Sequence, residues 1–153
     1  MRATLTLALL LGASGAQAQP PNATAPPPQT PAQFYQAGEA FARCSATFAY
    51  AALLAKRQGM EDSAKAFEGM ERGWRLTGLI LLTQGLVEQR QLEALSLFDT
   101  LQAIKVDQMK AQREADPDGF VAWSQQDYKS NCDQWFDLRV NMIRVMRGSA
   151  PPQ

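Results

Sequence analysis

Apolar residues recur at helical spacing over most of the chain, and the clearest example lies between residues 31 and 58. Steps of three and four residues place three phenylalanines and several small residues on one face: Phe34, Ala37, Phe41, Cys44, Phe48, Ala51 and Ala55. This spacing predicts an amphipathic helix whose large and small side chains interdigitate with a neighbouring helix. Because no stretch shows the two-residue alternation of a half-buried strand, we expect an all-α fold.

Local signals define both ends of this first helix. Thr30 is a good N-cap residue, Pro31 suits the first helical position, and Gln33 completes a capping box. Gly59 follows Gln58 and favours the left-handed conformation that ends a helix. These signals predict a helix from about Pro31 to Gln58.

A second helix is predicted to begin near Glu61 or Asp62. Its apolar stripe comprises Ala64, Phe67, Met70, Trp74, Thr77 and Leu81. Acid-first pairs four residues apart, which stabilise an exposed helix face, are expected at Glu68–Arg72 and Glu71–Arg75. The segment from Met60 to Asp116 lacks proline and would form a helix of about 85 Å, so it must fold back. The weak turn signals between Gly85 and Gln91 predict the break there.

Two more helices complete the predicted fold. The third is expected from about Leu92 to Arg113, with its apolar face at Leu95, Phe98, Leu101, Ile104 and Met109. Asp116-Pro117-Asp118-Gly119 is a strong turn sequence. The fourth helix is expected from about Phe120 to Arg147, with its apolar face at Tyr128, Cys132, Trp135, Leu138, Met142 and Val145. Gly148 and the prolines that follow it predict its end.

The two cysteines test this arrangement. Cys44 lies about 20 Å along the first helix, and Cys132 lies about 22 Å from the end of the fourth. In an up-down-up-down four-helix bundle these helices are adjacent and antiparallel, so both cysteines fall at one height. The sequence therefore predicts such a bundle over residues 31–148, with one disulfide between Cys44 and Cys132.

The N-terminal residues have the pattern of a secretory signal peptide. Arg2 precedes an apolar run from Leu5 to Leu11, and Ala16-Gln17-Ala18 forms a small-residue cleavage site. The apolar run is much shorter than the roughly 20 residues that span a bilayer. We expect cleavage after Ala18 and a periplasmic or secreted protein, an oxidising location in which paired cysteines form disulfides. Residues 19–30 are proline-rich and predict a disordered spacer, and residues 149–153 predict a flexible tail.

Composition narrows the function. The chain has 15 basic and 15 acidic residues, and this balance argues against nucleic acid as a partner. It contains no histidine, so histidine-dependent catalysis and histidine metal ligation are excluded. The remaining candidate metal ligands are better explained as solvated or core residues: Glu68 with Glu71, Asp133 with Asp137, and the methionines. We predict no catalytic residue, metal, cofactor or membrane span.

The one candidate surface for a partner or ligand lies on the second predicted helix and is suggested by its glycines. Gly69, Gly73 and Gly78 interrupt the second helix, where each costs about 1 kcal/mol relative to alanine. A glycine at such a position is explained if another part of the protein, or a bound group, must approach the helix backbone closely. Together with Trp74, these glycines are predicted to flank a partner surface or a small apolar pocket.

The leading hypothesis is an exported, non-catalytic helical domain that binds an unknown protein in the periplasm or cell envelope, in the manner of an inhibitor or immunity protein. Two alternatives remain open at this point. One is a carrier of a small apolar ligand within the bundle, motivated by the glycines and aromatic residues of the second helix. The other is an envelope chaperone. The oligomeric state is not predicted by the sequence.

Overall fold

The regular structure of the protein is entirely helical, as the sequence predicts. The computed structural model describes residues 24–148, and no strand occurs among them. There are five α-helices, with bounds α1 Pro31–Arg57, α2 Glu61–Gly85, α3 Ala94–Ala115, α4 Phe120–Asn131 and α5 Phe136–Met146. Two short 3₁₀ segments, η1 Glu88–Glu93 and η2 Asp133–Trp135, precede α3 and α5. The predicted signal peptide, the first part of the spacer and the predicted tail lie outside the described residues.

The predicted boundaries of α1 are confirmed. The Thr30 hydroxyl accepts a hydrogen bond from the Gln33 amide at 3.3 Å, and the Gln33 side chain accepts one from the Thr30 amide at 3.1 Å. Gly59 has a φ of 71°, the left-handed conformation that ends the helix. The turn before α4 is also found, with the Gly119 amide donating to the Asp116 carboxylate at 2.9 Å.

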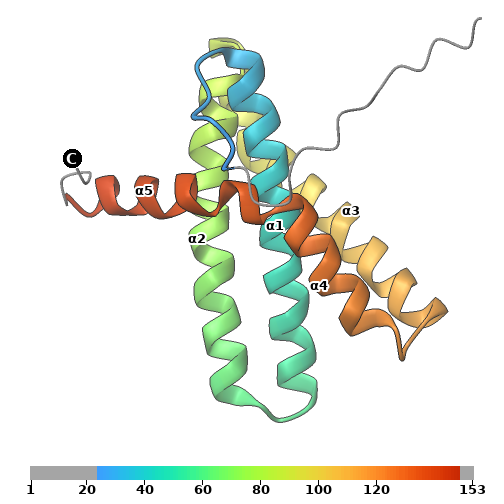
Figure 1. The fold of residues 1–153 in the computed structure, drawn as a ribbon. Helices are drawn as coiled ribbons and strands as arrows, with labels where there is room; N and C mark the ends of the chain where they lie inside the picture. The colour runs from blue at the N-terminus through green and yellow to red at the C-terminus, as the bar shows by residue number, and fades with distance from the viewer. Residues whose placement is uncertain (1–23, 149–153) are drawn as a thin grey trace, which may run out of the picture.

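The long helices α1 and α2 form an antiparallel hairpin that holds the centre of the core (Figure 1). Phe41 of α1 and Trp74 of α2 are fully buried and meet edge to face, with ring centroids 4.8 Å apart. Gly78 allows close approach, because a Cβ there would lie 2.6 Å from the Phe98 ring and 2.8 Å from the Phe41 Cβ. Aromatic burial at this junction supplies much of the apolar area that stabilises the fold.

The predicted buried face of the third helix is partly wrong. Leu95 and Ile104 are 53% and 62% exposed, whereas Ala94, Phe98 and Met109 are buried. Helix α3 packs on both α1 and α2, so the face that it buries is rotated relative to the predicted apolar face. Its start also differs from the prediction, because η1 occupies residues 88–93 where a plain break followed by helix was expected.

The predicted single helix from Phe120 to Arg147 is wrong. Helix α4 ends at Asn131, and α5 begins at Phe136 and crosses α2 (Figure 1). Ser130-Asn131-Cys132-Asp133 is a run of weak helix formers, and the side-chain amide of Asn131 donates to the Asp127 backbone carbonyl at 2.9 Å. The up-down-up-down four-helix topology is therefore not confirmed.

The cysteine pair lies where the sequence places it. The sulfur atoms of Cys44 and Cys132 lie at disulfide-bonding distance, and their Cα atoms are 5.8 Å apart. Both residues are buried. The pair fixes the end of α4 against the middle of α1, immediately before the chain changes direction.

Residues 24–30 contact the fold, although a disordered spacer was expected there. The Ala25 amide donates to the Gln134 carbonyl at 2.8 Å, and Ala25 is 6% exposed. The Thr24 hydroxyl lies 3.3 Å from the Asp137 carboxylate. This extended segment therefore lies against the junction between α4 and α5.

The expected ion pairs within α2 are replaced by contacts between helices. Glu68 pairs with Lys56 of α1, and Arg75 pairs with Asp99 of α3 at 2.6 Å. Glu71 accepts hydrogen bonds from Ser45 at 3.2 Å and from Gln102 at 3.0 Å. These acidic side chains connect helices instead of supporting one helix face.

Candidate functional site

A cleft among the described residues lies between α2 and α5. Its volume is about 660 Å³, within the range of ligand-binding pockets. It exists because the chain bends after Cys132 and sends α5 across α2 (Figure 1). Its lining combines arginines with aliphatic side chains and two glycines: Gly69, Arg72, Gly73, Leu76, Arg139, Val140, Ile143, Arg144, Met146 and Arg147.

Arg139 is the most unusual of these residues. It is only 7% exposed, yet none of its guanidinium nitrogens donates a hydrogen bond within residues 24–148, and its Nε is fully buried. The guanidinium carbon lies 5.2 Å from the centroid of Trp74 and 5.0 Å from that of Phe136. Burial lowers the pKa of Arg139 from its ordinary value, while the guanidinium remains charged.

Such an environment is costly for a cation. Aromatic rings attract it, but a buried charge normally also has an anionic partner or hydrogen-bond acceptors. The ion pairs found across residues 24–148 use Lys56, Arg75, Arg90, Lys105 and Lys110 instead. Arg139 therefore carries donors that a ligand could satisfy.

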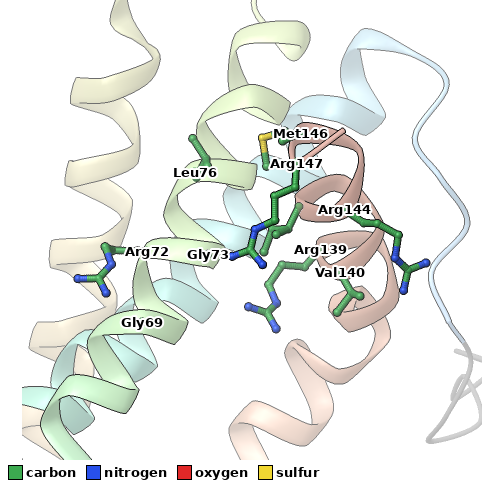
Figure 2. Close-up of a pocket in the computed structure, with 10 residues that line it drawn as sticks. Gly69, Arg72, Gly73, Leu76, Arg139, Val140, Arg144, Met146 and Arg147 are labelled. Carbon is green, nitrogen blue, oxygen red and sulfur yellow. The ribbon is translucent and has the colours of Figure 1, made fainter. Parts of the chain in front are cut away.

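Gly73 makes room for this arginine. A Cβ at Gly73 would lie 2.8 Å from Arg139 Nη1 and 3.2 Å from Ile143 Cδ1. Figure 2 shows the Arg139 and Arg147 side chains extending from the α5 side toward this part of α2. The glycine thus has the role expected of it, which is to permit close approach by another group.

Three further arginines surround the cleft, namely Arg72, Arg144 and Arg147. None forms an ion pair in the described part of the chain, and Arg144 makes one long contact of 3.5 Å with Asn141. No acidic residue lines the cleft. In a chain whose formal net charge is zero, this cluster is a local positive surface that attracts anions.

The cleft is lined by aliphatic side chains as well as by arginines. Leu76 is 51% exposed and Met146 is 41% exposed, and Val140 and Ile143, which also line the cleft, are half-buried. These side chains can gain free energy when apolar atoms cover them. The cleft is therefore suited to a group that is both anionic and apolar.

The predicted surface residues have separate locations in the structure. Gly69 and Gly73 line the cleft, Trp74 lies beneath the Arg139 guanidinium, and Gly78 lies in the core. The predicted surface residues did not include Arg139, Arg144 and Arg147, which line the cleft. Two sequence features could have revealed them. The three arginines cluster near the end of the last predicted helix, and Gly69 and Gly73 lie one helical turn apart on α2.

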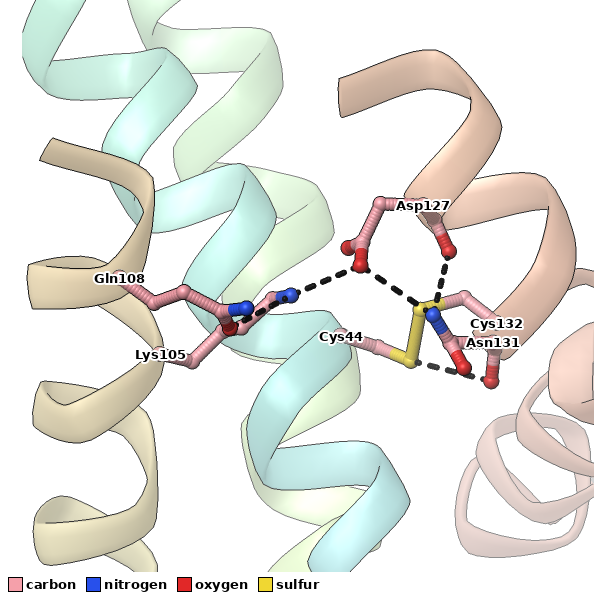
Figure 3. A network of polar contacts seen from close by, with 6 residues as sticks. All are labelled: Cys44, Lys105, Gln108, Asp127, Asn131 and Cys132. Carbon is pink, nitrogen blue, oxygen red and sulfur yellow. Dashed lines mark hydrogen bonds and ion pairs between the residues drawn. A yellow bond between two sulfur atoms is a disulfide. The ribbon is translucent and has the colours of Figure 1, made fainter. Parts of the chain in front are cut away.

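A second cleft of about 570 Å³ lies beside the cysteine pair, but its central charges are already paired. Lys105, which is 8% exposed, contacts Asp127 at 2.9 Å and Gln108 at 3.1 Å (Figure 3). It also lies 5.2 Å from the centroid of Trp123. These satisfied contacts join α3 to α4 and leave no free buried donor comparable to Arg139.

Within the described range, no three side chains among histidine, cysteine, aspartate and glutamate come together in a metal-binding group. Over residues 24–148, no helix has both the length and the apolar character needed to cross a membrane. Comparisons with protein-family models, curated proteins and solved structures return no match.

Proposed function

We propose that this chain is an exported, non-catalytic helical domain that binds another protein in the periplasm or cell envelope, and that the α2–α5 cleft is its binding surface. One observation carries the proposal: Arg139 is only 7% exposed, and it has neither an acidic partner nor a hydrogen bond among residues 24–148. A protein tolerates such a destabilising arrangement where function requires it. The partner supplies the missing acidic group.

Further features support this proposal. The rim arginines, Arg72, Arg144 and Arg147, favour approach by an acidic surface and would speed association. The exposed Leu76 and Met146 offer apolar contact around the charged centre. The signal-peptide pattern of residues 1–18 and the Cys44–Cys132 distance are compatible with export.

Site-specific photocrosslinking tests the proposal. A photoreactive amino acid replaces Leu76 at the cleft, and a matched control places it at Val121 of α4, which is 61% exposed and outside the cleft. In cells that export the protein, we expect a discrete protein adduct from position 76 and none from position 121. The same adduct should be lost when Arg139 is changed to Gln. Equal adducts at both positions, or none at position 76, would contradict the proposal.

The ligand-carrier alternative retains one specific observation in its favour, the size of the cleft. A volume of about 660 Å³ would accept a small molecule. The site lies on the surface between α2 and α5, whereas the sequence-based hypothesis placed it inside the bundle. A chaperone would need a broad apolar face, and the arginines of this cleft favour a more selective acidic partner.

A further inference from the structure

We infer that the α2–α5 cleft is a site for a carboxylate carried on a short aliphatic chain, with the Arg139 guanidinium as its anchor. The inference rests on the proposed assignment of this cleft as the binding surface, and it adds the chemistry of the group that enters. Two sources could supply such a group: the C-terminal residue of a protein partner, or a free aliphatic acid.

The surroundings of Arg139 favour a planar anion. Trp74 and Phe136 lie against the guanidinium, with ring centroids 5.2 Å and 5.0 Å from its carbon, and no group of residues 24–148 accepts a hydrogen bond from its buried Nε. A guanidinium presents its N–H groups as a planar fork that matches the two oxygens of a carboxylate. The guanidinium lies against Gly73, where a Cβ would be 2.8 Å from Nη1, and both residues line the cleft, so a ligand in the cleft can reach this group.

The rest of the lining selects the ligand further. Val140, Ile143 and Leu76 surround the charged centre with aliphatic side chains, and such a surface disfavours a strongly hydrated dianion such as phosphate. A singly charged carboxylate balances the single buried cation. The other three arginines lie at the rim and provide long-range attraction.

The test uses the oxidised mature protein and four small probes: N-acetyl-L-leucine, its uncharged amide, octanoate and octanamide. Binding is measured by calorimetry and by NMR titration. We expect saturable binding of at least one acid, at least about tenfold tighter than that of its amide. Equal binding of acid and amide, or no saturable binding of either acid, would overturn the inference.

A set of variants assigns the binding to Arg139. Arg139→Gln should weaken acid binding at least about tenfold. Gly73→Ala should weaken it as well, because the new Cβ would displace the guanidinium. Arg90→Gln is the matched control, since Arg90 lies in η1 outside the cleft, where it pairs with Glu93 at the surface. Wild-type affinity in both Arg139→Gln and Gly73→Ala would also overturn the inference.

The outcomes separate this inference from the proposed function. If octanoate binds and N-acetyl-L-leucine does not, the carboxylate site stands and the protein-partner proposal loses its support. If position 76 crosslinks to a protein while neither acid binds, the protein-partner proposal stands and the carboxylate inference fails. Binding of N-acetyl-L-leucine together with the crosslink supports both.

Discussion

The guanidinium of Arg139 lies over the indole ring of Trp74, 5.2 Å from its centroid. Trp74 also meets Phe41 with a centroid distance of 4.8 Å, so one fully buried side chain belongs to the core and also supports the arginine that lines the cleft. The α1–α2 hairpin therefore positions the buried cation directly. A rigid aromatic support of this kind preorganises the guanidinium for an incoming anion.

Arg139→Met should leave the free energy of unfolding unchanged or raise it by about 1 kcal/mol. Methionine keeps an apolar stem in the same space and removes a buried charge that has no partner. Urea unfolding followed by tryptophan fluorescence and circular dichroism measures the effect. A loss of more than about 2 kcal/mol would assign Arg139 to the stability of the fold instead of to binding.

Replacing Cys44 and Cys132 together by alanine should lower the free energy of unfolding by about 4 kcal/mol, because the bond closes a loop of 88 residues in the unfolded chain. Urea unfolding of the oxidised wild type and the double variant gives the difference. The mass of the exported protein without reductant should be lower by two hydrogen atoms than after reduction. Full alkylation of both thiols in the native exported protein would contradict the bond.

Two glycines of α2 should respond in opposite directions to substitution by alanine. At Gly78 a Cβ would lie 2.6 Å from the Phe98 ring and 2.8 Å from the Phe41 Cβ, so Gly78→Ala should destabilise by about 1–3 kcal/mol. Gly69→Ala has open space and should stabilise the helix by about 0.5–1 kcal/mol. Thermal unfolding of both variants provides the comparison. Equal effects of the two changes would show that the close packing around Gly78 is absent.

Tyr128 should make stability depend on alkaline pH. Burial, with a smaller effect of Asp133, raises the pKa of its hydroxyl above the ordinary value of 10.0. The folded state therefore holds this proton more tightly. The resulting stabilisation is present below pH 10.0 and is lost as the pH rises through the raised value.

Tyr128→Phe is the matched variant for this effect, because it keeps a ring against Phe48, whose centroid lies 5.5 Å away, and cannot ionise. Unfolding of both proteins is measured from about pH 9 to about pH 11. The stability of the wild type relative to the variant should fall across this range. Parallel curves would indicate that the pKa of Tyr128 is not raised.

Export should remove residues 1–18 and leave Gln19 as the first residue. N-terminal sequencing and intact mass of the protein from a periplasmic extract test this expectation. Ala18→Phe is the control, because a bulky residue at the A-x-A site should block cleavage and retain the longer form. Recovery of the wild-type chain with its N-terminal residues intact would contradict the predicted processing.

Helix type and several helix ends could be predicted because their causes are local. Thr30 and Gln33 exchange hydrogen bonds across three residues, Gly59 ends α1 through its own backbone conformation, and Asp116 caps the turn at Gly119. Four buried positions of α1 also follow from its regular spacing, namely Ala37, Phe41, Cys44 and Ala55. The rotated face of α3 could not be read in this way, since two neighbouring helices together determine which residues of α3 are buried.

The sequence by itself determined the helical structure of residues 24–148 and the ends of its first helix, because capping, turn chemistry and periodicity act within a few residues. It also determined which cysteines pair, since the sequence contains only Cys44 and Cys132. Only the tertiary structure decided that the last predicted helix breaks after Asn131 and that α5 crosses α2. That change of direction places Trp135, Leu138 and Met142 on the core around Trp74, and so leaves Arg139 buried beside Gly73. The physical reason is long-range packing: residues far apart in sequence compete for one apolar surface, and no local pattern records the outcome.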